Sequence, residues 1–171
     1  IINILKGDYN NFTPEGLEYQ TASAFMCLAD PSSLIKPNYS ADTDGYPKSH
    51  AKANFPDIEC FLNEYNLICE VTKLTGRNQW YQESVPIQRH LHEFESKNNN
   101  KESYCLFIAP RFHDDGLWSI WCSVKHGYLD GNKQKIIPLT IHDFSEILIY
   151  FSGIKDFELN FRNFLNRCLN L

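Results

Sequence analysis

Several features are missing from this chain of 171 residues, and each absence excludes a class of protein. No apolar run approaches the roughly 18 residues of a membrane-spanning helix, so we expect no membrane contact. The isolated glycines form no Gly-rich phosphate loop of the nucleotide-binding kind. The first residues, IINILKGDYNN, have neither the basic start nor the cleavage site of a signal peptide, which predicts a cytoplasmic protein.

The six cysteines include no CxxC pair, and their spacing predicts neither a zinc site nor a disulfide framework. Each lies among apolar residues, so we interpret all six as buried free thiols of a reducing compartment. They are Cys27, Cys60, Cys69, Cys105, Cys122 and Cys168.

Basic residues are outnumbered, with 16 Lys and Arg against 21 Asp and Glu and a net charge of −5. A protein that binds DNA tightly by itself usually has a basic face, because counterion release supplies most of the affinity. Either DNA is not the substrate, or something else brings the DNA. With 43% apolar residues, the chain is suited to one ordered domain with a real core, and we expect it to be too short for a second, sequence-reading domain.

The first half of the chain predicts a helix, an irregular stretch and a hairpin. Thr13 followed by Pro14 is typical of a helix start. Residues 31–54 are polar and rich in Pro, Gly, Asn and Ser, which predicts a long loop or a small insertion. The runs IECFL and LICEVT are prone to β-structure and predict a hairpin around residues 63–66.

The second half alternates helices and strands. We expect a helix over about 79–95 that Pro86 breaks or restarts near Ser84. The chain then continues with a buried strand over 104–109 and a helix capped by Asp114. A strand over 135–140 follows, and Pro138 predicts that it lies at a sheet edge or ends there. Two closing helices complete the chain. This order predicts the α/β class, with a central mixed sheet flanked by helices.

Alternation along the hairpin gathers three acidic side chains on one face of the sheet, since Asp57, Glu59 and Glu70 share that face with Thr72. A turn centred on residues 64–65 would place Glu59 opposite Glu70. Three clustered carboxylates raise one another's pKa unless a cation lies among them, and their oxygens suit Mg²⁺ or Mn²⁺. The alternative is the solvated face of an edge hairpin.

One sequence motif resembles the PD-(D/E)xK nuclease signature: Pro56-Asp57, then a hairpin, then Glu70-x-Thr72. The longer run PDIEC…LICEVTKLTGRNQWYQE, with LFIAP and IIPLT after it, is similar to the AlwI-type restriction endonucleases. Within that family it most resembles the small subunits of heterodimeric type IIS enzymes whose large subunits are nicking endonucleases. The resemblance extends from about Thr13 to the closing helices.

The resemblance implies a set of site residues and a cofactor, Mg²⁺ with Mn²⁺ as a possible substitute. The implied metal ligands are three acids and one main-chain carbonyl, namely Asp57, Glu70, Glu83 and that of Val71. Glu18 matches an acid directed toward the metal site. Thr72 occupies the position of the usual lysine, which the AlwI-like group also lacks. The role of that lysine then falls to Glu83 or to a second metal.

For Glu18 and Glu83 the residues themselves leave plainer alternatives open, namely a surface position and an acid favoured near a helix start. Lys73 is next to the lysine position, but alternation sends it to the opposite face, so we reject it as a replacement unless the strand ends there. Glu59 receives no ligand role.

Weaker candidates for contact with DNA lie outside the hairpin. Residues Arg77, Asn78 and Gln79 could bind phosphate at a helix N-terminus, with capping as the alternative. We interpret His90 and His92 as surface residues on different helix faces, and His113-Asp114-Asp115 as helix capping. Two explanations stay open for Lys48, His50 and Lys52: they contact DNA, or they are charged surface residues in solvent.

These expectations describe residues 1–171 as a single catalytic nuclease domain that cuts one strand of double-stranded DNA. The resemblance implies a bacterial, cytoplasmic enzyme that is inactive or nearly so alone and acts with a larger, DNA-recognising nicking subunit. Two alternatives remain open: a non-catalytic interaction subunit of a DNA-binding complex, and a repair or junction nuclease of the same fold.

Overall fold

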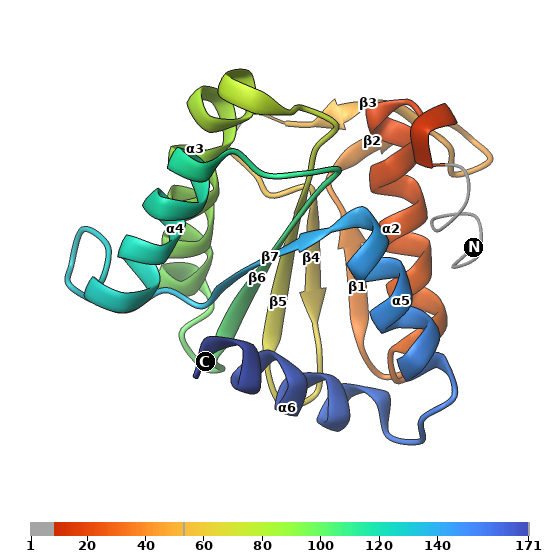
Figure 1. Ribbon diagram of the computed structural model, residues 1–171. Coiled ribbons are helices and arrows are strands. Elements are labelled where there is room, and N and C mark those ends of the chain that lie inside the picture. The colour runs from red at the N-terminus through yellow and green to blue at the C-terminus, as the bar shows by residue number, and fades with distance from the viewer. Residues whose placement is uncertain (1–8, 53, 171) are drawn as a thin grey trace.

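Five strands form the central sheet of the computed structural model, which describes residues 9–52 and 54–170 (Figure 1). Their order is β1 (Leu34–Pro37), β4 (Ile58–Phe61), β5 (Asn66–Val71), β6 (Ser103–Ala109) and β7 (Ile136–Thr140). The pairs β1–β4 and β4–β5 are antiparallel, whereas β5–β6 and β6–β7 are parallel. The predicted mixed sheet is confirmed, and Pro138 lies in an edge strand as expected. The stretch 1–8, which bears most of the signal-peptide argument, lies outside the described residues.

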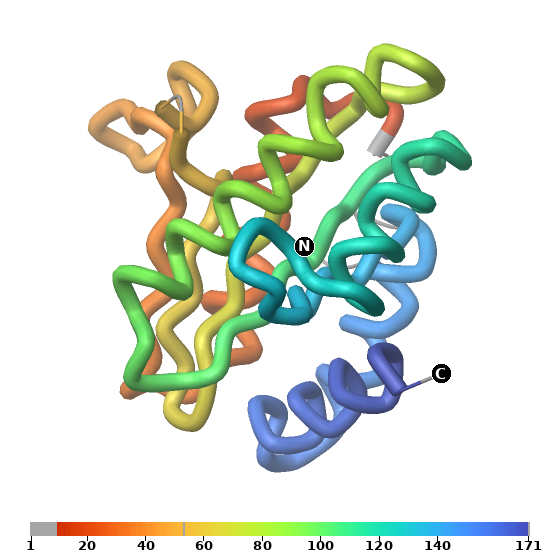
Figure 2. The backbone as a smooth tube through the Cα atoms, turned by 90° about the vertical axis from the view of Figure 1, so that its left-hand side faces the viewer, coloured from red at the N-terminus to blue at the C-terminus, as the bar shows by residue number. Residues whose placement is uncertain are grey.

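Helices cover both faces of the sheet (Figures 1 and 2). On one face lie α2 (Pro14–Leu28), α5 (Ile141–Ser152) and α6 (Phe157–Leu169), and on the other α3 (Gly76–Lys97) and α4 (Asp114–His126). A short 3-10 helix, η1 (Tyr9–Asn11), precedes α2. In the described part of the chain, no helix has the length and apolarity needed to cross a bilayer.

Two hydrophobic cores lie on opposite sides of the sheet. The larger core packs α2, α5 and α6 against the sheet and contains a cluster of phenylalanine rings around Phe161. The smaller core joins α3 to the sheet through Ile87, Leu91 and Phe94. Strands β5 and β6 are buried along their whole length, because both faces of the sheet are covered.

The interpretation of residues 31–54 as a loop is wrong, because this stretch contains three strands. Strand β1 forms the edge of the main sheet, and β2 (Tyr39–Ala41) pairs with β3 (Pro47–Ala51) in a separate hairpin. The hairpin packs on α2, where the ring of Tyr19 stacks on that of Tyr46 with centroids 5.2 Å apart. These strands are only three to five residues long and contain few apolar residues, so the sequence pattern does not reveal them.

Helix α3 is continuous through Pro86, so the predicted break near Ser84 is wrong. Proline removes one main-chain hydrogen bond, but the buried stripe of Ile87, Leu91 and Phe94 holds the following turns against the sheet. The cap of α4 is also corrected: His113, not Asp114, is the N-cap residue, and its Nδ1 accepts a hydrogen bond from the Asp115 N–H.

The prediction that all six cysteines are buried holds for only three of them. Cys60, Cys69 and Cys105 are fully buried at the sheet, where burial raises the pKa of the Cys69 and Cys105 thiols. Cys27 is exposed near the end of α2, and Cys122 and Cys168 are partly exposed on helices. The three buried thiols lie in strands of a sheet that is covered on both faces, whereas each helix buries only one of its faces.

Candidate active site

A pocket of about 510 Å³ opens at one end of the sheet, between α2, α3 and the β2–β3 hairpin. Four carboxylates from four parts of the chain line it: Glu18 from α2, Asp57 just before β4, Glu70 near the end of β5, and Glu83 from α3. Glu18 and Glu70 are only 2% and 5% exposed. The tertiary structure therefore brings together all the acids that the sequence selected for catalysis.

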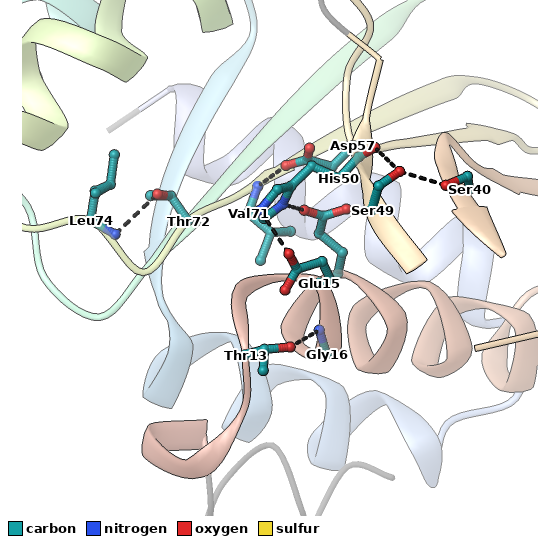
Figure 3. Close-up of polar contacts among 11 residues, drawn as sticks. Thr13, Glu15, Gly16, Ser40, Ser49, His50, Asp57, Val71, Thr72 and Leu74 are labelled. Atoms are coloured by element: carbon teal, nitrogen blue, oxygen red, sulfur yellow. Dashed lines mark hydrogen bonds and ion pairs between the residues drawn. The ribbon is translucent and has the colours of Figure 1, made fainter. Parts of the chain in front are cut away.

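The register of the β4–β5 hairpin fixes two of these acids. Ile58 pairs with Cys69, and the same register continued by one residue brings Asp57 opposite Glu70. This is a shift of two residues from the predicted register, which leaves every side chain on its predicted face. The main-chain N–H of Val71 donates to Asp57 Oδ2 over 2.7 Å, which ties the two ends of the hairpin together (Figure 3).

Glu59 shares this face of β4 but takes a structural role. It is buried and forms an ion pair with Lys36, its cross-strand neighbour on β1. It does not line the acidic pocket, which agrees with leaving it out of the ligand set.

Burial and mutual repulsion act on the carboxyl groups of the pocket. Burial raises the pKa of Glu70 well above its ordinary value, and the charges of Glu83 and Glu18 raise it further. The pKa of Asp57 is also well raised, by burial first and then by Glu70 and Glu18. Burial raises the pKa of Glu83 as well, although its hydrogen bond with Thr72 opposes the shift. Such a group of acids holds protons until a cation replaces them.

Glu83 lies two helical turns inside α3, so the capping explanation for its position does not apply. Thr72, which follows directly after β5, connects Glu83 to the hairpin. The Thr72 hydroxyl accepts the Leu74 N–H over 3.0 Å (Figure 3). Its hydrogen bond with Glu83 lowers the pKa of that carboxyl group. A hydroxyl held in this way orients the Glu83 carboxylate toward the acids of the sheet.

His90 belongs to the pocket, so its interpretation as a surface residue is wrong. It is 9% exposed, its Nδ1 lies 2.8 Å from Glu70 Oε1, and its Nε2 is buried with no hydrogen-bond partner among the described residues. Burial lowers the pKa of His90 and raises that of Glu70, so the contact is most favourable to the uncharged forms of both groups. The missed signal was the seven-residue spacing between Glu83 and His90, which places both on one helix face. His92, by contrast, is partly exposed near Asp130.

Strand β5 ends at Val71, so alternation does not decide where Lys73 lies, and its contacts do. Its ammonium group donates to the main-chain carbonyls of Asn10 and Phe12, at 3.0 and 2.5 Å. It therefore attaches the segment before α2 to the end of β5, and its ammonium group hydrogen-bonds to that segment.

We expect the Lys73→Met substitution to lower the free energy of unfolding by about 1 kcal/mol, because two hydrogen bonds from a partly exposed cation are lost. Mn²⁺ binding by the acidic pocket should not change. Urea unfolding and Mn²⁺ titration measure the two quantities, with exposed Lys133→Met as the control. A loss of Mn²⁺ affinity with unchanged stability would contradict this assignment.

Of the three residues predicted to touch phosphate, Gln79 is excluded by its contacts. It is 2% exposed, its Nε2 donates to the carbonyls of Leu74 and Arg111, and its Oε1 accepts the His113 N–H. It joins the start of α3 to the loop before α4. Arg77 and Asn78 are exposed at the same helix start, so contact with DNA stays a prediction for them.

Comparison with known proteins identifies the family. The sequence model of the AlwI restriction endonuclease family matches residues 9–147, which covers most of the chain and all the acids of the pocket. The chain belongs to the AlwI restriction endonuclease family. A comparison with curated proteins gives no match.

A solved structure shares the fold of this AlwI-family chain. It is the small subunit (R.BspD6I2) of the heterodimeric restriction endonuclease R.BspD6I, with a TM-score of 0.78 and 20% sequence identity. The match covers 98% of this chain and 87% of the other. The predicted family and fold are both confirmed.

The donor atoms of this AlwI-family pocket suit a hard divalent cation, since several carboxylates with raised pKa values line one cavity. Within residues 9–52 and 54–170, however, no group of three or more His, Cys, Asp or Glu side chains is already arranged as a metal site. Each carboxylate has a protein partner instead: Val71 N–H for Asp57, His90 for Glu70 and Thr72 for Glu83. The pocket therefore fits the ion by its chemistry, with its acids held by hydrogen bonds.

Proposed function

We propose that this protein is the small catalytic subunit of a heterodimeric type IIS restriction endonuclease and cleaves one strand of double-stranded DNA in the presence of Mg²⁺. The observation that carries the proposal is the convergence of Asp57, Glu70 and Glu83 on one pocket of an AlwI-family fold. The charges of Glu70 and Glu83 raise the pKa of Asp57, and the charge of Glu83 raises that of Glu70, which supports a close cluster of acids.

The protein groups that would hold Mg²⁺, or Mn²⁺ in its place, are the carboxylates of Asp57, Glu70 and Glu83 and the main-chain carbonyl of Val71. This arrangement corresponds to the active site of PD-(D/E)xK nucleases. When bound, the ion neutralises charge at the scissile phosphate and lowers the pKa of water.

The remaining work falls to side chains around the ligands. Glu83, oriented by the Thr72 hydroxyl, accepts the proton of the attacking water, which is the role that lysine has in related enzymes. His90 holds the Glu70 carboxylate in place through its Nδ1. In-line attack leaves a 5′-phosphate and a 3′-hydroxyl, and one such site cuts one strand.

A larger partner that recognises DNA completes the proposal. With a net charge of −5, this chain is poorly suited to tight DNA binding by itself. The solved structure that shares its fold is a subunit of a heterodimeric restriction enzyme, which supports a similar arrangement here. The partner binds an asymmetric site, nicks its own strand and delivers the other strand to this pocket.

The experiment combines this chain with the protein encoded next to it and maps nicks on a duplex labelled on each strand. The complex should cut both strands in Mg²⁺, whereas the isolated chain should cut plasmid DNA at least about 100-fold more slowly. Asp57→Ala should abolish the cut in one strand only and weaken Mn²⁺ binding. Asp44→Ala, in the exposed turn between β2 and β3, is the matched control.

Two results would contradict separate parts of the proposal. Unchanged Mn²⁺ affinity and unchanged cleavage in Asp57→Ala would leave a non-catalytic interaction subunit as the better description. Robust cutting of plasmid DNA by the isolated chain would remove the dependence on a partner and favour a repair or junction nuclease.

A further inference from the structure

The β2–β3 hairpin is connected to α2 beside the acidic pocket by a histidine. His50, on β3, lies with Nδ1 3.0 Å from Glu18 Oε1 and Nε2 2.9 Å from Glu15 Oε1 (Figure 3). The two acids are three residues apart and so lie on the same face of α2. Both ring nitrogens can donate to carboxylates only in the imidazolium form, and the contact with Glu18 raises the pKa of His50 accordingly.

Glu18 is the buried half of this arrangement. The residue is 2% exposed, and burial raises its pKa, while hydrogen bonds from His50 and from the main chain of Ala51 lower it. His50 engages one carboxylate oxygen, whereas Oε2 is buried with no hydrogen-bond partner among the described residues. Glu18 also lines the pocket and raises the pKa of both Asp57 and Glu70. A buried carboxylate tied at one oxygen has a defined direction for the other.

The rest of the hairpin is attached to α2 by aromatic rings and by the main chain of Ala51, which contacts Glu18. Tyr39 and Tyr46 pack their rings on Tyr19 of α2, and the backbone beyond β3 lines the mouth of the pocket through Lys52, Asn54 and Phe55. His50 itself has a side chain that is 57% exposed, so packing does not explain its position. The contacts of its ring with Glu15 and Glu18 explain this position.

We propose that His50 is a positioning residue, which holds the free oxygen of Glu18 at the acidic pocket and fixes the β2–β3 hairpin against α2. This inference rests on the proposed nuclease function. Catalytic groups must be held within about 0.5 Å of their productive geometry by supporting contacts, and His50 supplies such a contact to Glu18 from a separate element. The residue acts through Glu18 and does not itself need to touch DNA.

The test uses the complex of this chain with its larger partner and measures three quantities: the single-turnover rate of strand cleavage, the Kd for DNA, and amide hydrogen exchange over residues 39–51. We expect His50→Ala to slow cleavage about tenfold with unchanged Kd and to speed exchange in the hairpin. His50→Gln keeps one donor for Glu18 and should recover most of the rate. His142→Ala, an exposed histidine beside Asp143 on α5, is the control.

Glu15→Gln separates positioning of Glu18 from attachment of the hairpin. It weakens only the outer contact of His50, so hairpin exchange should rise while cleavage stays near the wild-type rate. Wild-type cleavage by His50→Ala would overturn the proposal, as would a loss that appears entirely in Kd, because that result makes His50 a DNA contact. If Asp57→Ala is inactive in the same assay, such a result rejects only this inference. If Asp57→Ala remains active, the nuclease function itself fails.

Discussion

Replacing Glu70 by Gln is expected to lower cleavage of one strand by about 10³-fold or more, while making the metal-free chain more stable at pH 8. Loss of a ligand removes several kcal/mol of charge stabilisation at the phosphate, and each 1.36 kcal/mol corresponds to a factor of ten. The amide can still bond with His90, so the pocket should keep its shape.

The expected gain in stability follows from the raised pKa of Glu70. A carboxyl group whose pKa is higher in the folded state than in the unfolded state binds more protons when folded. Below the unfolded pKa of about 4.3 it costs nothing, and as the pH rises through the folded pKa the folded state loses stability. Gln carries no charge, so it avoids this loss and also relieves the repulsion on Asp57.

Thermal unfolding in EDTA at pH 4 and pH 8 measures this effect, with strand cleavage measured in parallel. Glu70→Gln should melt a few degrees above wild type at pH 8 and close to it at pH 4, since each 1 kcal/mol shifts the melting temperature by roughly 2–4 °C. Glu64→Gln, an exposed acid in the turn of the same hairpin, should change neither quantity. A lower melting temperature of Glu70→Gln at pH 8 would contradict this prediction, because it would show that the ionised Glu70 side chain stabilises the fold.

Phe161→Ala is expected to destabilise the protein by about 3–5 kcal/mol, a large part of the 5–15 kcal/mol that holds a typical domain. The ring is fully buried and contacts the rings of Phe25, Phe151, Phe157 and Phe164, which belong to three helices. Its removal leaves a cavity that these rigid aromatic neighbours cannot fill.

Urea unfolding followed by circular dichroism gives the change in free energy. Leu159→Ala lies on the same helix with its side chain exposed, so it should cost little. Strand cleavage by Phe161→Ala, measured well below its unfolding transition, should be close to wild type because α6 does not line the acidic pocket. A change below about 1 kcal/mol would contradict the role assigned to this aromatic core.

The sequence by itself determined the features that depend on short-range periodicity. Alternation along the hairpin placed Asp57 and Glu70 on one face, and a register shift of two residues did not alter this result. Thr13 and Pro14 marked the start of α2, and Pro138 marked the edge strand. These are local rules, because each depends only on the geometry of consecutive residues.

The tertiary structure decided which distant residues meet. Burial against the sheet kept α3 helical through Pro86 and so brought His90 to Glu70, 20 residues earlier in the chain. The polar stretch 31–54 became strands only because a sheet edge and α2 were available to pair and pack with it. The same packing brought His50 to Glu18, 32 residues away. Partners of this kind depend on how buried surfaces fit together, which no local pattern of the sequence encodes.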